Sequence, residues 1–142
     1  MIEVEKLDQA MIEEILKTNP QGIMSFLDGD KPYSVPLLHV FLNGRIYFAF
    51  SKEGRKQRCL EKSTNVCYVV LFKDCSLIIE GSLEKVKDER EIRSVLPIFC
   101  KMEEIPKKIC EDFIIKSISH PKIGLYSLKP KEISGWRLRR KS

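Results

Sequence analysis

Residues 33–51 read YSVPLLHVFLNGRIYFAFS, and this stretch decides the fold. It contains two runs typical of β-strands, 33–42 and 45–51, joined by Asn43-Gly44. An Asn-Gly pair is the strongest two-residue hairpin signal, because both residues tolerate the positive φ angles of the favoured tight turns. Together with the apolar run 22–27, the stretch predicts three antiparallel strands in succession.

The rest of the chain alternates between expected helices and strands. Asp8 is a suitable N-cap for a helix that ends near Lys17. Further helices are expected at 55–63, 89–99 and 105–118, and further strands at 66–72, 76–86, 123–128 and 133–138. The first three strands leave no room for the crossovers of a parallel sheet. We therefore predict a mainly β fold, an antiparallel barrel of six or so strands with flanking helices, since closure removes exposed sheet edges.

Length and composition fit one domain covering residues 1–142, with 43% hydrophobic and 32% charged residues. The net charge is +5, but four basic residues fall in the last six positions, and residues 1–136 carry 21 basic against 20 acidic residues. The charge therefore indicates a short basic tail rather than a nucleic-acid-binding surface. The acidic start and the lack of an apolar run of about 18 residues indicate neither a signal peptide nor a membrane span. We expect a cytoplasmic protein.

The five cysteines suggest neither a metal site nor a disulfide framework. They are Cys59, Cys67, Cys75, Cys100 and Cys110, at spacings of 8, 8, 25 and 10 and without a CxxC pair. Zinc sites and disulfide scaffolds show paired, recognisable spacings. We therefore expect reduced, partly buried thiols and no metal.

Four cations crowd the expected strand-to-helix junction SKEGRKQR at residues 51–58. Positive side chains in the first turn of a helix oppose the helix dipole, whereas an anion gains from that dipole and from free backbone N–H groups. A bound phosphate would explain the crowding, with Arg55, Lys56 and the Ser51 hydroxyl as donors. The alternative is a solvated basic helix face.

Two residues interrupt expected strands. Pro36 cannot donate to a β-ladder, so it belongs on an edge strand or beside a bulge, where neighbouring backbone groups stay free. Those groups could bind a flat heteroaromatic ligand, or the proline merely protects an edge strand from aggregation. Gly81 is expected at a bend of strand 76–86, where the missing side chain relieves curvature or admits a close neighbour.

Four segments in this order, PYSVPL (32–37), NGRIYF (43–48), EGRK (53–56) and TNVCYVV (64–70), carry a family resemblance. They resemble the FMN-binding split barrels of the pyridoxamine 5′-phosphate oxidase-like superfamily, and most of all its flavoproteins related to nitroimidazole reductases. The resemblance covers residues 21–86, with a weaker echo at 133–135. It implies a six-stranded antiparallel split barrel that forms a homodimer and holds two FMN molecules at the subunit interface.

The resemblance also implies where the cofactor lies. The isoalloxazine would rest against strand residues 35–38, while Arg55 and Lys56, after Ser51, would grip the phosphate. The strand around Gly81 of the other subunit would close over the ring. The predicted cofactor-binding residues are Val35, Pro36, Leu37, Leu38, Phe50, Ser51, Arg55, Lys56, Gly81 and Trp136.

Three positions depart from the relatives or stay open. Ala49 stands where nitroimidazole-reductase-like sequences commonly carry a histidine, and Ser34 where the biosynthetic oxidases carry an arginine. The full C-terminal substrate-binding signature is also missing, so we do not expect pyridoxamine phosphate oxidation. Trp136 could stack on a ring, although a lone aromatic near a terminal strand is more often a core or interface anchor.

The first functional hypothesis is an FMN-dependent oxidoreductase that passes electrons from NAD(P)H to an unidentified small acceptor. No catalytic side chain is assigned, because flavin supplies the redox chemistry while the protein sets position, polarity and solvent access. The second hypothesis is a non-catalytic FMN-binding or redox-sensing module. The third is a barrel that has lost its ligand and acts through protein contacts. Relatives on this fold can hold deazaflavin or haem in place of FMN.

Overall fold

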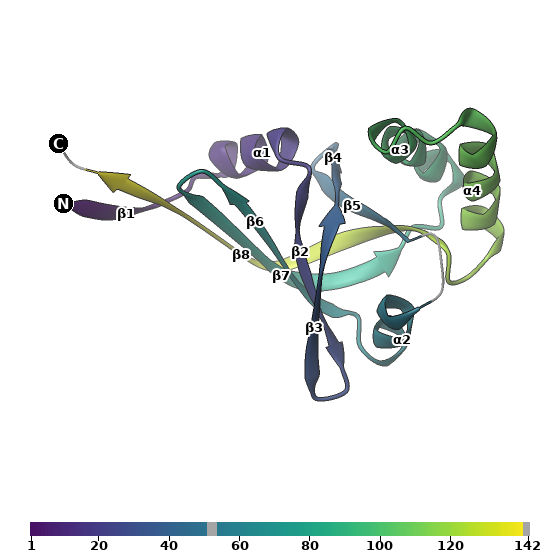
Figure 1. The fold of residues 1–142 in the computed structure, drawn as a ribbon, viewed down its shortest axis with the longest axis horizontal. Coiled ribbons are helices and arrows are strands. Elements are labelled where there is room, and N and C mark those ends of the chain that lie inside the picture. Colours follow the sequence, from purple (N-terminus) through teal and green to yellow (C-terminus); the bar gives the residue numbers. More distant parts are fainter. Residues whose placement is uncertain (51–53, 141–142) are drawn as a thin grey trace.

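The chain folds into a long twisted antiparallel sheet with helices along its margins (Figure 1). The computed structural model describes residues 1–50 and 54–140. The strands are β1 (Ile2–Lys6), β2 (Gln21–Asp28), β3 (Lys31–Leu38), β4 (Val40–Leu42), β5 (Arg45–Phe50), β6 (Asn65–Phe72), β7 (Cys75–Lys85) and β8 (Gly124–Arg140). The helices are α1 (Gln9–Thr18), α2 (Arg55–Lys62), α3 (Glu89–Met102) and α4 (Lys107–Ser119).

The described strands follow the order β3-β2-β6-β7-β8-β5-β4, and β1 pairs with the far part of β8. The predicted fold class, an antiparallel split barrel with flanking helices, is confirmed. The ladder does not close, because β3 and β4 end the order and no described pairing joins them. The chain bends between them at His39, whose backbone N–H donates to the Pro20 carbonyl at 2.8 Å instead of continuing a strand.

Local signals placed several elements correctly. The Asp8 side chain accepts a hydrogen bond from the Met11 N–H at 2.8 Å, which caps α1 as predicted. Asn43 and Gly44 have φ angles of 52° and 75°, so both adopt the left-handed conformation that a tight hairpin between β4 and β5 requires. The predicted helices at 55–63, 89–99 and 105–118 appear as α2, α3 and α4.

The expected strand boundaries were wrong in three places. The expected strand 33–42 is divided at His39, and a strand at residues 2–6 was not expected. The two expected C-terminal strands form one strand, β8, which runs through Pro130. Pro130 is tolerated because the register between β7 and β8 shifts at Glu80/Gly81, and such a bulge relaxes the need for a ladder hydrogen bond.

Two groups of buried apolar side chains stabilise the fold. The larger lies inside the barrel, with Met24, Phe48 and Tyr68 fully buried at its centre. The smaller lies between the sheet and the α3–α4 pair, with Leu96 and Leu125 fully buried. The second core fixes the helix pair against β5 and the start of β8.

Candidate functional site

A cavity of about 800 Å³ lies between β3, β5 and the α3–α4 helix pair. Its sheet wall consists of Gln21, Pro36, Leu37, Leu38 and Ala49. Its helix wall consists of Phe99, Cys100, Ile105, Pro106, Ile109 and Phe113, and its charged residues are Glu103, Glu104, Asp112 and Lys116. Small-molecule sites commonly enclose about 300–1,000 Å³ behind mostly apolar walls, so this cavity is the candidate ligand site.

Most of the sheet wall of the cavity belongs to β3, which is an edge strand, as Pro36 predicted. Pro36 lies opposite Ile23 of β2, and β3 has no described partner on its other side. The outer edge of β3 therefore carries backbone groups that no ladder uses. Leu38 and Ala49 pack against the smaller core, which directs this part of β3 and β5 toward the helices.

The helix wall is held in place by polar contacts at both ends. On α3, Glu91 forms an ion pair with Arg45 at 2.9 Å and accepts a hydrogen bond from the Tyr47 hydroxyl, which ties the helix to β5. After α4, the Lys85 ammonium donates to the Ile123 carbonyl at 2.6 Å. These contacts connect α3 to β5 and the segment after α4 to β7.

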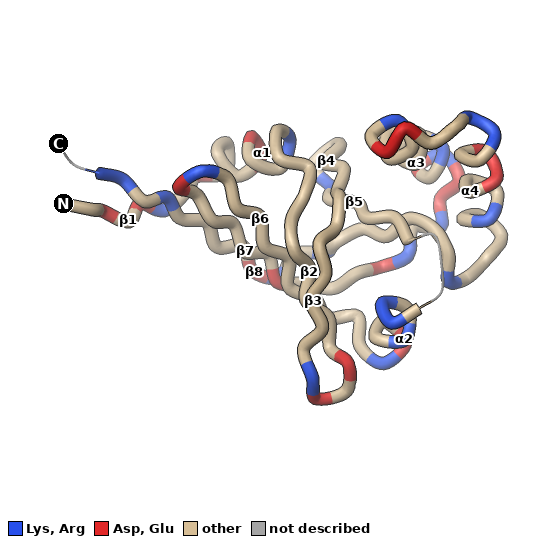
Figure 2. Tube along the Cα trace, viewed as in Figure 1, with Lys and Arg blue, Asp and Glu red and all other residues tan. Residues whose placement is uncertain are grey.

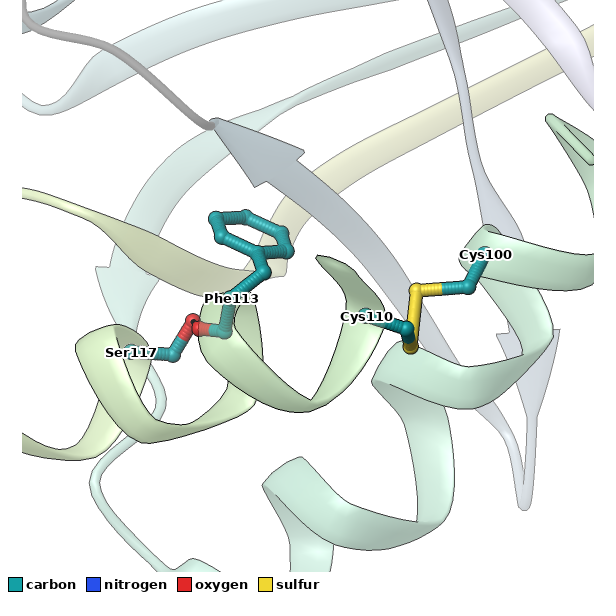
Figure 3. Close-up of a disulfide and its surroundings, with 4 residues drawn as sticks. All are labelled: Cys100, Cys110, Phe113 and Ser117. Atoms are coloured by element: carbon teal, nitrogen blue, oxygen red, sulfur yellow. Dashed lines mark hydrogen bonds between the residues drawn. A yellow bond between two sulfur atoms is a disulfide. The ribbon is translucent and has the colours of Figure 1, made fainter. Parts of the chain in front are cut away.

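A disulfide joins Cys100 of α3 to Cys110 of α4, with their Cα atoms 6.0 Å apart (Figure 3). The expectation of reduced thiols is therefore wrong for this pair, whereas Cys59, Cys67 and Cys75 are free. Both bridged cysteines are buried, and Cys100 belongs to the cavity wall. Their spacing of ten residues did not reveal the pair, because α4 must first fold back on α3 to bring the sulfurs together.

The predicted phosphate cations lie on α2, where Lys and Arg gather (Figure 2). Gly54 precedes the helix and supplies no side-chain cap, and the first turn contains no acidic residue. The first N–H groups of a helix lack intrahelical partners, so they are available to an anion at this end. Ser51, the third predicted phosphate donor, lies outside the described residues.

Arg55 and Lys56 differ in how they are held. The Arg55 guanidinium pairs with Asp28 at 2.8 Å and stacks over the Tyr33 ring, 4.1 Å from its centroid. The hydrogen bond from Arg55 lowers the pKa of the Asp28 carboxyl below its usual value. The Lys56 ammonium lies 5.8 Å from the Phe50 ring centroid and has no ion pair with any residue in the described part of the chain. Arg55 would therefore share its guanidinium between a phosphate and Asp28, whereas no described residue places this constraint on Lys56.

Strand β3 contacts both the basic start of α2 and the cavity. Tyr33, which contacts Arg55, lies three residues before Pro36, and a strand rises about 3.3 Å per residue, so the two positions are about 10 Å apart. Their side chains point to opposite faces of β3, because three residues is an odd number of steps. The donor chemistry at α2 fits a phosphate, and the mostly apolar cavity beside the free strand edge fits a flat ring system.

Gly81 and Trp136 are not brought to this cavity within the chain. A Cβ on Gly81 would collide with the backbone carbonyl of Lys129, so the close neighbour that this glycine admits is strand β8 itself. Trp136 lies on β8 opposite Lys6 and Ser76, with 43% of its surface exposed. The predicted roles of Gly81 toward the cofactor of a second subunit and of Trp136 as a cofactor-binding residue stay predictions.

Sequence reasoning missed the helix wall. Ile109 and Phe113 are four residues apart, which places them on one face of α4, and Ile105 comes just before the N-cap Pro106. Ile109 is 59% exposed, although it lines the cavity. That periodicity was a usable signal, but it could not show that the face is turned toward β3 and not wholly into the core.

The fold defines a class, an antiparallel split barrel with a candidate ligand cavity between its sheet and a helix pair, and comparison with known proteins gives the family. A family model described as pyridoxamine 5′-phosphate oxidase matches residues 8–137. The chain therefore belongs to the pyridoxamine 5′-phosphate oxidase family. No curated protein matches the sequence.

Solved structures share the fold at low sequence identity. An FAD-binding protein from Mesorhizobium loti has 19% identity and a TM-score of 0.70, with 99% of this chain and 100% of the other covered. A candidate 5-nitroimidazole antibiotic resistance protein from Bacteroides thetaiotaomicron has 17% identity and a TM-score of 0.69, with 99% and 93% covered. An FAD-binding protein from Mycobacterium smegmatis has 17% identity and a TM-score of 0.63, with 96% and 100% covered. Among the described residues, no helix is long and apolar enough to cross a membrane.

Proposed function

We propose that the protein binds FMN, with the phosphate at the start of α2 and the isoalloxazine against the Pro36 segment of β3. Membership of the family supports a flavin ligand, and two of the similar structures are named FAD-binding proteins. The observation that carries the proposal is the placement of the cavity and the uncapped basic helix start at two ends of one edge strand.

The start of α2, the edge of β3 and the helix wall would each contact a different part of FMN. Lys56, Arg55 and the free N–H groups of α2 would bind the phosphate through charge-assisted hydrogen bonds. The unpaired edge of β3 around Leu37 would bind polar atoms of the ring, while the mostly apolar helix wall restricts access of water. When bound, FMN supplies the capacity to accept and pass on electrons.

We further propose a homodimer. Pro36, Ile23, Val69 and Ile78 form one row across neighbouring strands on an exposed face of the sheet. Ile23 and Ile78 are 50% and 36% exposed, and Trp136 on β8 is exposed too. Exposed apolar surface of this kind marks interaction sites. The row begins at Pro36, which also lines the cavity. A second copy on this face would bring its own residues to the cavity.

As an enzyme, the protein would take electrons from NAD(P)H and pass them to a small acceptor, and we place this activity in the cytoplasm. The test is to purify the chain, record its absorbance spectrum and identify the bound molecule by mass. We expect flavin absorbance, the mass of FMN and steady oxidation of NAD(P)H with added acceptors. A preparation that holds deazaflavin or haem, or that stays colourless after incubation with FMN, would overturn the proposal.

The Cys100–Cys110 disulfide supports the second candidate function, a flavin-binding redox sensor. Disulfides in the cytoplasm are usually transient and catalytic or redox-sensing, and this one forms part of the cavity wall. If the protein is a sensor, reduction of the disulfide changes FMN affinity while NAD(P)H is not consumed. Steady turnover that is the same with oxidised and reduced cysteines favours the enzyme.

A further inference from the structure

We propose that an arm of the sheet, formed by β1 and residues 136–140 of β8, docks on the outer face of the sheet of a second copy of this chain. The inference rests on the proposed homodimer and adds the segment that holds the two copies and the direction in which they meet. The arm extends beyond the helices and the rest of the sheet (Figure 1).

One face of the arm is apolar and exposed. In the register between its two strands, Val4 lies opposite Leu138 and Lys6 lies opposite Trp136, so these side chains share a face. Alternation along β1 adds Ile2 to the same face. The four apolar side chains are between 43% and 61% exposed, which leaves this face to solvent in a single chain.

The opposite face of the arm is polar and is paired within the chain. The Arg137 guanidinium lies 3.0 Å from the Glu5 carboxylate, and the Arg139 guanidinium lies 3.5 Å from it. These contacts join the two strands of the arm on that side. The apolar face is therefore the one on which a partner removes hydrophobic surface from water.

The apolar face of the arm continues onto the outer face of the sheet. Trp136 lies opposite Ser76 of β7, and Ser76 lies opposite Leu71 of β6, which is 72% exposed. Two residues along β7, Ile78 belongs to the row proposed for the homodimer interface. Residues two apart in a strand share a face, so the arm and that row form one surface. A second copy supplies the same apolar surface, which makes the contact self-complementary.

Unpaired charges lie at both ends of this surface. Lys6 and Arg140 belong to the apolar face of the arm, and neither forms an ion pair with another described residue. On the other side of the Ile78 row, Glu80 of β7 lies opposite Glu132 of β8, and both are exposed without a described ion pair. Like charges directly opposite in a sheet are destabilising, so these two carboxylates gain from cations that a second copy supplies.

Neighbouring cations do not cancel this acidic pair. Lys131 adjoins Glu132 and sets one positive charge against two carboxylates, while Lys129 is paired with Glu84 at 4.0 Å. If the β8 strands of two stacked copies run antiparallel, the cationic arm of each copy lies toward the acidic pair of the other. Parallel β8 strands would bring arm onto arm and acid onto acid. The charges therefore favour the antiparallel arrangement, which two-fold symmetry repeats.

The dimer dissociation constant, measured by analytical ultracentrifugation, tests the role of the arm. V4T/L138T keeps β-branched side chains but removes most of the apolar surface at both positions. Because each position is buried twice in a symmetric dimer, the dissociation constant should rise at least about tenfold. The control R139T alters the polar face of the same arm and should stay within about threefold of the wild type.

Charge reversal tests the direction in which the copies meet. K6E/R140E and E80K/E132K should each weaken the dimer at least about tenfold, because an exposed ion pair changes affinity by about twofold to fivefold and symmetry repeats each pair. An equimolar mixture of the two variants should form a heterodimer close to wild-type affinity, since arm and sheet then carry opposite charges at both contacts. The chain with all four reversals should likewise dimerise.

A wild-type dimer whose dissociation constant is unchanged in V4T/L138T would overturn the inference and leave the proposed homodimer in place. So would charge variants that associate neither in the mixture nor in the fourfold variant. A monomeric wild type would overturn both, including one whose arm binds vesicles of anionic lipid instead. A dimer that responds as expected but stays colourless with FMN supports the inference and overturns only the proposed flavin binding.

Discussion

Removing the Cys100–Cys110 disulfide should destabilise the protein by an amount that follows from its position in the chain. In the chain-entropy account, a cross-link restricts the unfolded chain, and a loop of about ten residues corresponds to about 2.7 kcal/mol at 25 °C. Each Cys→Ser change also places a hydroxyl in a buried apolar cluster, which costs further stability. We therefore expect C100S/C110S to lower the free energy of unfolding by about 3 kcal/mol or more.

Urea unfolding monitored by circular dichroism measures this change. The wild type is compared with and without a dithiol reductant, which converts the disulfide into two thiols and avoids the added hydroxyls. Reduction should lower the midpoint of the wild type and leave the midpoint of C100S/C110S unchanged. A matched control is C67S, which alters a half-buried free cysteine on β6. If the reductant leaves the wild-type midpoint unchanged, the bridge either does not form or does not restrain the unfolded chain, and the reasoning is refuted.

Three further predictions concern the fold and its assembly. Burial lowers the pKa of His39 below its ordinary value near 6.5, so the unfolded chain binds a proton at a higher pH than the folded chain does. The free energy of unfolding should therefore fall as the pH drops below about 6.5. The slope, up to about 1.4 kcal/mol per pH unit, should decrease in H39Q but not in H120Q, measured by urea unfolding at pH 5 and 7. G81A should be destabilised by about 1–3 kcal/mol because its Cβ meets the backbone of β8. In the same assay G54A, whose Cβ meets nothing within 4 Å among the described residues, should lose only the cost of a poorer N-cap residue, about 0.5 kcal/mol. I78E should shift a dimer to monomer in analytical ultracentrifugation, and a wild type that sediments as a monomer would contradict the proposed interface.

Local sequence signals determined much of the fold. The cap at Asp8 and the turn at Asn43-Gly44 act within a few residues, so they could be recognised without the tertiary structure. Pro36 could be assigned to an edge strand because its missing N–H restricts where it can lie in a sheet. The continuous strand β8 could not be recognised, because Pro130 is tolerated only where β7 shifts its register.

The candidate site was predicted only in part. The Pro36 segment and the cations of α2 stand out in the sequence, because a proline in a strand and cations at a helix start both oppose local preferences. The helix wall and its disulfide depend on how α3 and α4 pack, and their residues resemble those of any amphipathic helix pair. Gly81 drew attention for its missing side chain, but only the structure shows that β8 occupies the space.

The central claim is that α2 binds the phosphate of FMN. The most direct measurement is a fluorescence titration of flavin-free protein with FMN and with riboflavin, which lacks the phosphate, in the wild type and in R55A/K56A. Charge-assisted hydrogen bonds contribute about 1.5–3 kcal/mol each, so the wild type should bind FMN at least tenfold more tightly than riboflavin. The variant should lose most of this advantage, because only the N–H groups at the start of α2 would remain for the phosphate. Equal affinities of the wild type for the two flavins, or an undiminished advantage of FMN in R55A/K56A, would contradict the claim.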